Sequence, residues 1–246
     1  MFIFFHLLTG LLLGFLIGDI LHDRRWIIPC AIGAILPDLI DKPLGLLLFA
    51  GSIGNGRIYG HTLLFFFVML VTGLLVWRYL KSTVILALSA GILSHEILDL
   101  MWMKMETWLW PFMGPFPGKL PEDYFFTLFN AELDNLSEVI LAILFCSGCI
   151  LFLASLKNNA VREKLLRIPK NIFRCGAVIL CMLSGILLGL GLGKLTNLNP
   201  GKIPPVIMGW TRPEEFIIGG VMLALAAWLL WRWQTGVTYR EYVTIK

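Results

Sequence analysis

Seven apolar stretches, each close to the length of a membrane-crossing helix, constrain this chain more than any other feature. A helix needs about 20 mostly apolar residues to cross the hydrocarbon core of a bilayer. Only 15% of the residues are charged, which is well below the share in typical soluble domains. We therefore predict an all-α, polytopic transmembrane bundle of about seven helices. The stretches comprise residues 2–20, 26–50, 58–79, 84–103, 136–156, 173–195 and 216–231.

Two prolines interrupt the second stretch. Pro37 and Pro43 enclose two aspartates and a lysine, and a proline removes a backbone donor and breaks or kinks a helix. We expect helix 2 to be broken at Pro37–Pro43, with residues 44–53 either re-entrant or near the outer interface. Irregular backbone at this depth is tolerated only where it lines a polar cavity or is buried in protein. The break therefore indicates a site.

The basic residues predict how the chain threads the membrane, because Lys and Arg favour cytoplasmic loops. With seven crossings and the N-terminus outside, 13 of the 20 basic residues fall on the inner side. We predict a protein integral to the inner membrane, with its N-terminus outside, its C-terminus in the cytoplasm and membrane lipids as partners. The basic residues are spread over several loops, so nothing suggests nucleic-acid binding.

Ionisable side chains inside membrane-crossing helices are costly, by roughly 2.5–3.5 kcal/mol each at the helix centre, so each one suggests a function. The threading derived above, from Lys and Arg alone, places all of the strongest candidates in the outer half of the membrane. They are His6, Asp38, Asp41, His61, His95, Glu96 and Asp99.

Helical periodicity predicts which way two of these helices face. His95 and Asp99 are four residues apart and share one face with the small residue Gly91, whereas Glu96 points about 100° away. His6 stands at the head of a glycine stripe that should pack inside the bundle. That stripe contains Gly10, Gly14 and Gly18, and a second stripe of Gly185, Gly189 and Gly193 is expected to pack in the same way.

Three histidines and three aspartates that converge in a bundle suit a divalent metal. Imidazole and carboxylate bind zinc, and manganese where more oxygens take part. His95 and Asp99 would supply two ligands from one helical turn. The candidates suffice for one or two ions, and two ions could hold the attacking and leaving oxygens of a hydrolytic reaction. Hydrolysis by a metal-activated water is the chemistry that we expect.

Simpler interpretations remain for individual residues. A lone His6 at a membrane interface is often only an interfacial polar residue, and His95 with Asp99 can form a hydrogen-bonded pair without metal. The rival function is a transporter or ion-binding membrane protein that uses the buried His/Asp cluster as a transit site. An inverted repeat with two broken helices would favour transport, and the sequence has one clear break.

Four motifs in combination resemble the YdjM-like family of inner-membrane metal-dependent hydrolases, over about residues 1–116. They are Gly33-Ala-Ile-Leu-Pro-Asp-Leu-Ile-Asp-Lys-Pro-Leu, Gly56-Arg-Ile-Tyr-Gly-His-Thr-Leu, Ser94-His-Glu-Ile-Leu-Asp and Trp108-Leu-Trp-Pro-Phe. The resemblance implies a metal-binding set of His6, Asp38, Asp41, His61, His95 and Asp99. It adds Arg57 as a nearby cation and implies that Trp110 and Pro111 close the site. Many members have a His-Arg pair where this chain has Gly56-Arg57, and a threonine where it has Gly60.

A weaker likeness concerns the order of the motifs. His, Asp, His and then His-x-x-x-Asp is similar to the order in zinc-dependent phospholipases C, which implies a phosphodiester, possibly a lipid headgroup, as substrate. We expect the catalytic residues to be Asp38, Asp41, Arg57 and Glu96, with the general base left open among a ligand carboxylate, Glu96 and Glu106. Residues 1–116 form the metal-site module. Residues 117–246 supply an outer loop and three further helices of the same membrane domain.

Overall fold

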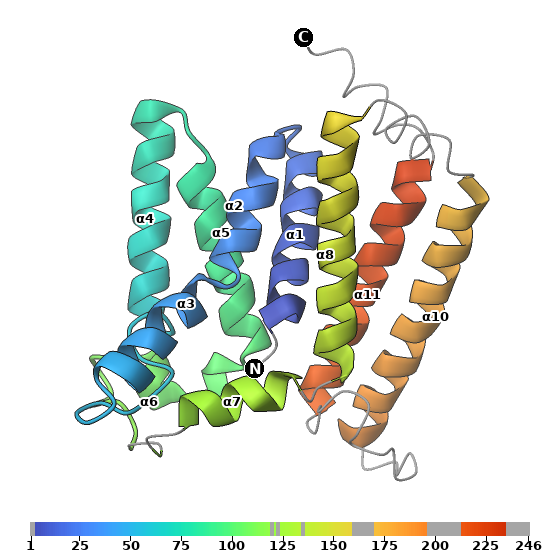
Figure 1. Ribbon diagram of the computed structural model, residues 1–246. Helices are drawn as coiled ribbons and strands as arrows, with labels where there is room; N and C mark the ends of the chain where they lie inside the picture. The colour runs from blue at the N-terminus through green and yellow to red at the C-terminus, as the bar shows by residue number, and fades with distance from the viewer. Residues whose placement is uncertain are drawn as a thin grey trace. The chain divides into compact units, whose positions relative to one another are not determined.

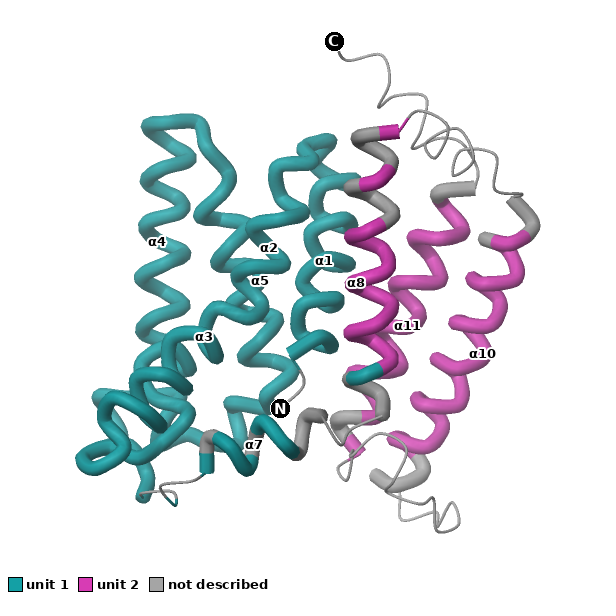
Figure 2. The backbone as a smooth tube through the Cα atoms, viewed as in Figure 1, with its two compact units in different colours: residues 1–139 teal, residues 140–246 magenta. Residues whose placement is uncertain are grey.

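The computed structural model describes residues 3–118, 121, 124–133, 136–158, 170–195 and 213–234. All regular structure in these ranges is helical, which confirms the predicted fold class (Figure 1). The chain divides into two compact units, residues 1–139 and residues 140–246 (Figure 2). The whole of the predicted metal-site module lies in the first unit.

The first unit is organised around one central helix, α5 (Val84–Leu98), which contacts four others. Those four are α1 (Ile3–Ile20), α2 (Ile27–Gly33), α3 (Leu36–Lys42) and α4 (Leu63–Leu80). α1 and α4 are long and apolar enough to cross a membrane, and α5 is a shorter apolar helix. The connecting elements are η1 (Arg24–Trp26), the π-helical η2 (Pro43–Leu48), η3 (Met101–Met103), α6 (Met105–Trp108) and α7 (Tyr124–Leu133), which runs crosswise to α4 and α5 (Figure 1).

Glycines allow α1, α2 and α5 to approach one another closely. A methyl group built on Gly33 would run into the Leu88 carbonyl of α5, and one built on Gly91 would run into the Cys30 carbonyl of α2. On α1, a Cβ at Gly10 would lie 2.8 Å from the Ala31 Cα atom. The predicted stripe that begins at His6 therefore packs in the interior, as expected. Close backbone contact of this kind is how helices associate in an apolar solvent, where the hydrophobic effect adds little.

The second apolar stretch is broken, but not where the prolines suggested. α2 ends at Gly33 and α3 begins at Leu36, so the interruption falls at residues 34–35. The predicted segment Pro37–Pro43 is itself helical up to Lys42 and continues into η2. The reason is that Pro37 occupies the first turn of α3, where a backbone N–H has no partner inside the helix and proline is tolerated.

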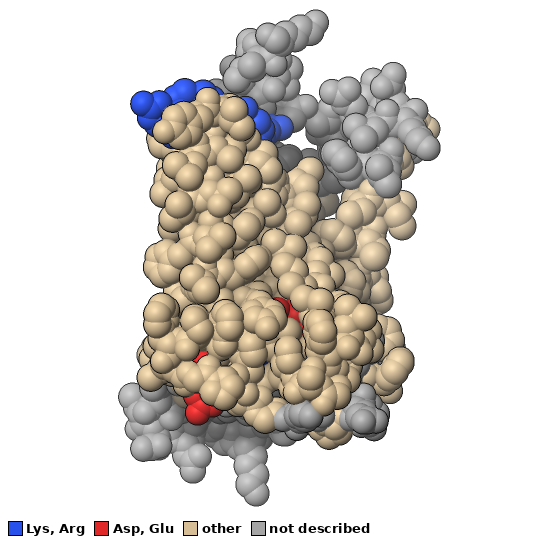
Figure 3. All heavy atoms as spheres, turned by 90° about the vertical axis from the view of Figure 1, so that its left-hand side faces the viewer, with Lys and Arg blue, Asp and Glu red and all other residues tan. Residues whose placement is uncertain are grey.

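One end of the first unit is basic. Arg24 and Arg25 are exposed after α1, as are Arg78 in the last turn of α4 and Lys81 just after it. A hydrogen bond of 3.1 Å from Thr83 Oγ1 to Asp23 Oδ2 joins the turns that follow the two helices. Figure 3 shows Lys and Arg gathered at this end of the face in view, with Asp and Glu toward the opposite end. The aspartates and histidines of interest lie at that opposite end.

The second unit contains most of α8 (Leu136–Lys157), from Ile140 onward, together with α10 (Lys170–Leu195) and α11 (Pro213–Gln234). α10 packs on α11 where a Cβ at Gly191 would lie 2.9 Å from the Pro213 carbonyl, and Ser184 Oγ donates to the Gly220 carbonyl at 2.7 Å. The predicted stripe is wrong in part, because Gly185 and Gly189 are exposed and a Cβ there meets nothing within 4 Å. Gly193 lies within α10, but its side-chain position is outside the described residues.

Candidate metal centre

The six predicted ligands come from three helices of the first unit and from the loop before α4. His6 is in the first turn of α1, Asp38 and Asp41 are on α3, and His61 immediately precedes α4. His95 and Asp99 stand at the C-terminal end of α5. His6, His61, His95 and Asp41 are at most 2% exposed, and Asp38 is 7% exposed. Such burial of ionisable groups requires that they bind one another or a cation.

The environment of His95 fixes its tautomer. Its Nδ1 atom lies 2.7 Å from the carbonyl oxygen of Ala34, which sits in the break between α2 and α3. A carbonyl can only accept a hydrogen bond, so Nδ1 carries the hydrogen. In the neutral ring, Nε2 then presents a lone pair. The break in the second stretch thus supplies the acceptor that orients a histidine of the neighbouring helix.

His61 is oriented in the same way by a carboxylate. Its Nδ1 atom lies 2.7 Å from Asp41 Oδ2, and its Nε2 atom lies 3.1 Å from the Nε2 atom of His95. With both Nδ1 atoms donating outward, two lone pairs face each other across 3.1 Å. Lone pairs at this distance need a proton or a metal ion between them. Histidines that hold metals are characteristically oriented through the other ring nitrogen, as these two are.

Asp41 accepts hydrogen bonds from the backbone of the loop before α4 as well as from the His61 ring. Its two oxygens accept the backbone N–H groups of Ile58 at 2.7 Å, Gly60 at 2.7 Å and His61 at 3.1 Å. A Cβ at Gly60 would press on Asp41 Oδ1 at 3.0 Å, so glycine at this position lets the loop close around the carboxylate. These contacts place Asp41 behind His61, on the side away from His95.

The remaining predicted ligands form two donor groups that share His95. His6, His95 and Asp99 make one group, and Asp38, His61 and His95 make the other; within each, the donor atoms lie within 4.8 Å of one another. His6 Nε2 is 3.3 Å from Asp99 Oδ1, and His61 Nε2 is 3.5 Å from Asp38 Oδ1. The buried His/Asp cluster can therefore hold a metal ion, and it offers two overlapping positions for one.

Asp38 and Asp99 each divide their oxygens between the histidines and a cation. Asp38 Oδ2 is 2.6 Å from Lys42 Nζ, and Asp99 Oδ2 accepts from Arg57 Nε at 2.7 Å. Arg57 was expected near the site because of the family resemblance. Lys42 was not predicted as part of the site, although its spacing of four residues from Asp38 on one helix is a signal for an ion pair.

Glu96 is buried, although it points away from His95. It is 1% exposed, and neither of its carboxylate oxygens has a hydrogen-bond partner among the described residues. The charges of His61, Asp99, Asp41 and Arg57 all act on it. An interfacial position for Glu96, facing lipid headgroups, is therefore excluded, and its carboxylate belongs to the electrostatic environment of the cluster.

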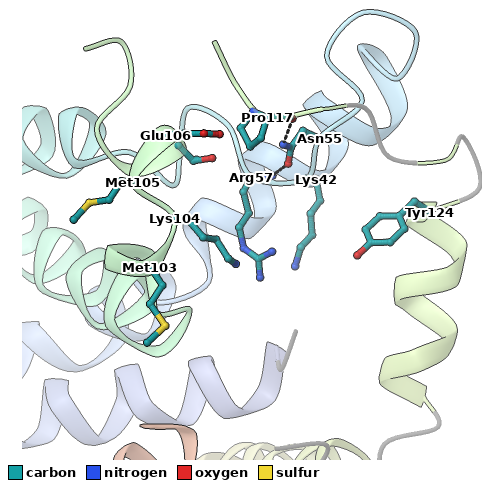
Figure 4. A pocket seen from close by; sticks show the side chains of 11 residues that line it. Lys42, Asn55, Arg57, Met103, Lys104, Met105, Glu106, Pro117 and Tyr124 are labelled. Atoms are coloured by element: carbon teal, nitrogen blue, oxygen red, sulfur yellow. Dashed lines mark hydrogen bonds between the residues drawn. The ribbon is translucent and has the colours of Figure 1, made fainter. Parts of the chain in front are cut away.

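A pocket of about 710 Å³ adjoins the cluster (Figure 4). Lys42, Arg57 and Lys104 line it, and the nitrogen ends of all three point into the same space. Tyr124 of α7 points its hydroxyl toward them, whereas Glu106 lies apart from the cations. The sequence did not indicate Lys104 or Tyr124 as pocket residues, because no motif or helical spacing links either of them to the His/Asp cluster.

A segment that contains Trp110, Phe116 and Pro117, called the aromatic strap below, lies beside this pocket. Trp110 stacks on Phe116 with ring centroids 5.2 Å apart and meets Tyr59 edge-on at the same distance. Asn55 Nδ2 donates to the Pro117 carbonyl at 2.8 Å, which ties the strap to the loop before α4. Trp110, named by the family resemblance as a closing residue, thus packs against the loop that carries Arg57. Pro111 follows it on the exposed surface of the strap.

A buried His/Asp cluster in a helical bundle with apolar outer faces defines an integral membrane protein with a candidate metal centre. The family model of the YdjM inner membrane protein matches residues 1–168, and the chain belongs to this family. No curated protein matches the chain, and no solved structure does.

Proposed function

We propose that this protein is a membrane-bound metal-dependent hydrolase that cleaves an ester or phosphodiester at the non-cytoplasmic side of the membrane. The observation that carries the proposal is the pair of Nε2 atoms of His61 and His95, which face each other at 3.1 Å with both Nδ1 atoms held by acceptors. Carboxylate oxygens of Asp38 and Asp99 lie beside these two nitrogens, so that nitrogen and oxygen donors suited to a divalent metal ion come together at one place.

The ligand set consists of His6, Asp38, His61, His95 and Asp99, with one or two ions. Nitrogen and carboxylate donors in this number favour zinc, with manganese as the second choice. When bound, such an ion acts as a Lewis acid and makes water a nucleophile at neutral pH. Asp41, predicted as a ligand and catalytic residue, orients His61 in this proposal.

The chain supplies two further groups for the reaction. Arg57 lines the pocket and can steady an anionic group of the substrate, as donors aimed at developing charge do in hydrolases. Glu96 is the better candidate for proton transfer, because its carboxylate is buried without a hydrogen-bond partner among the described residues. Glu106, which lines the outer part of the pocket, is the alternative.

The position of the site supports hydrolysis over transit of an ion. His6 is in the first turn of α1, His61 precedes α4 and His95 is in the last turn of α5, so the cluster lies toward one end of the bundle. Transporter sites typically lie near the bilayer midplane. The exposed basic turns mark the opposite end as cytoplasmic by the positive-inside rule. The cluster then faces the outer side, with the N-terminus outside and the C-terminus cytoplasmic.

Metal content of the detergent-purified protein tests the proposal. Elemental mass spectrometry of the wild type should give near-stoichiometric zinc or manganese, and His95→Ala and Asp38→Ala should lose it. Size-exclusion chromatography checks that both variants stay folded. The loaded protein should then hydrolyse a chromogenic phosphodiester or carboxylic ester. Wild-type protein that carries no metal even after reconstitution with zinc or manganese would refute the hydrolase and favour an ion or proton pathway.

A further inference from the structure

The pocket beside the candidate metal centre concentrates positive charge at the end of the first unit that lies opposite the exposed basic turns. Lys42, Arg57 and Lys104 line it together, and their side chains converge (Figure 4). Lys42 is only 8% exposed, so this is a built position and not a solvated surface lysine. Three cations that converge in one cavity create a positive potential that attracts an anion. The arrangement is the kind that proteins use to hold phosphate.

Two of these cations are already bound to the candidate metal ligands. Lys42 contacts Asp38 and Arg57 contacts Asp99, each through one carboxylate oxygen, while the other oxygen of each aspartate faces the histidines. In the described part of the cluster, the aspartates roughly balance the cations. A divalent ion among the histidines would add two positive charges and leave the pocket cationic overall. Anion binding in the pocket and metal binding in the cluster should therefore strengthen each other.

The rim of the pocket is apolar, which fits a ligand with a hydrocarbon part. Met103 and Met105 line the pocket and are 47% and 46% exposed. α7 carries Tyr124 into the pocket and exposes Phe126 and Phe129. A crosswise helix with exposed aromatic residues is suited to lie in the headgroup region of a bilayer. The opening of the pocket would then stand at the depth of the phosphates.

We infer that Lys42, Arg57 and Lys104 form a binding site for the phosphate group of the substrate, with the Tyr124 hydroxyl as a further donor. The substrate class is thus a phosphate ester, whether a phospholipid headgroup or a soluble phosphoester. The inference rests on the proposed hydrolase, since it gives the pocket the role of that enzyme's substrate site. Binding itself, however, needs only the chain's own cations and can be measured without turnover.

The test measures binding of inorganic phosphate by isothermal titration calorimetry, first in chelator and then with zinc. Lys104→Gln is the main variant, because Lys104 lines the pocket and is not one of the proposed metal ligands. Arg78→Gln is the matched control, since it removes one positive charge at the opposite, exposed end of the unit. We expect Lys104→Gln to weaken phosphate binding about tenfold, as the loss of one charge-assisted hydrogen bond does. Arg78→Gln should leave it unchanged.

A second arm separates the two sources of phosphate. Two competitors are tested for displacement of bound phosphate. One is glycerol 3-phosphate in solution; the other is phosphatidylglycerol in nanodiscs, with phosphatidylcholine nanodiscs as the reference. Competition by the soluble ester alone assigns a soluble phosphoester, and competition by phosphatidylglycerol assigns the headgroup. Phosphate that binds wild type and Lys104→Gln equally, or binds neither, overturns the inference. If Lys104-dependent phosphate binding persists in protein that takes up no metal, the phosphate site stands and the hydrolase falls. If metal binds without Lys104-dependent phosphate binding, the proposed phosphate site is wrong and the proposed hydrolase is unaffected.

Discussion

Lys42 and Asp38, one helical turn apart on α3, join the cationic pocket to the metal centre through an ion pair of 2.6 Å that is about nine-tenths buried. A buried pair of this kind is weak evidence for stability, but removing one partner leaves the other as an uncompensated buried charge. A metal ion bound by Asp38 would therefore change the charge balance that Lys42 maintains at this position.

The variant Lys42→Met tests this charge balance. We expect it to lower the unfolding free energy of the metal-free protein by about 3 kcal/mol, because Asp38 loses its cation in a buried site. Zinc should restore more stability to Lys42→Met than it adds to the wild type, since the ion neutralises the same carboxylate. Thermal unfolding in detergent, with and without zinc, measures both effects. The double variant Lys42→Met/Asp38→Asn is the control and should be less destabilised than Lys42→Met alone.

Asp41 and Asp38 lie on the same short helix but should respond differently to the same substitution. Asp41→Asn replaces an acceptor of three backbone N–H groups and of His61 Nδ1, so the loop before α4 loosens and His61 loses its orientation. We expect both a lower unfolding temperature and a loss of metal affinity of about 10- to 100-fold. Asp38→Asn should lose metal while keeping that loop intact. Asp38→Asn also breaks the buried ion pair with Lys42 and loses stability for that reason, so the loop itself has to be measured. Faster hydrogen exchange at the Ile58, Gly60 and His61 amides in Asp38→Asn as well as in Asp41→Asn would contradict the distinction.

The sequence could predict the helical fold and the interior position of the cluster, because both follow from periodicity and from the cost of charge in lipid. His6 on its glycine stripe and His95 one turn from Asp99 were placed on the correct faces by spacing alone. Spacing could not tell the ligand-like carboxylates from the orienting one. Asp38 and Asp41 look equivalent in the sequence, and only the course of residues 58–61 around α3 puts Asp41 behind His61.

Two glycine stripes also look alike in the sequence and differ in the structure. The stripe on α1 meets backbone of α2, whereas Gly185 and Gly189 on α10 face open space. A glycine stripe indicates only that a neighbouring helix is able to approach closely. Whether it occurs depends on the neighbouring helix, and a single sequence does not contain that information. The same limit applies to Lys104 and Tyr124, which enter the pocket through tertiary contacts only.

Gly91 provides a test of the close packing between α5 and α2. A Cβ at Gly91 would run into the Cys30 carbonyl and lie 2.7 Å from Ala34 N, and neither backbone atom can move aside without shifting α2. We expect Gly91→Ala to lower the melting temperature measured in detergent by several degrees and to reduce metal content, since Ala34 orients His95. Gly185→Ala is the matched control. Alanine is the better helix former and meets no neighbour there, so stability should be unchanged or slightly higher.

The proposed membrane orientation, with the basic turns on the cytoplasmic side, can be measured directly. In a cysteine-free background, Lys81→Cys should be protected from a membrane-impermeant maleimide in intact cells and labelled after the membrane is opened. Glu106→Cys, on the exposed surface beside the pocket at the opposite end of the unit, should be labelled in intact cells. The reverse pattern would place the metal centre on the cytoplasmic side. The substrate would then have to be sought there.

Glu96 and Glu106 compete for the proton-transfer role, and paired amide variants separate them. Glu96→Gln keeps the size of the side chain, and Glu96 is not a member of either His/Asp group, so metal content should be preserved. If Glu96 moves the proton, hydrolysis should fall by about 100-fold or more, which is the usual contribution of a positioned acid or base. Glu106→Gln should then retain most of the activity, because Glu106 is exposed at the pocket. Metal content and turnover are measured on the same preparations, so that a lost ion is not mistaken for a lost base. If Glu106→Gln is the variant that loses activity with its metal intact, the proton passes through the pocket and the buried carboxylate of Glu96 is structural.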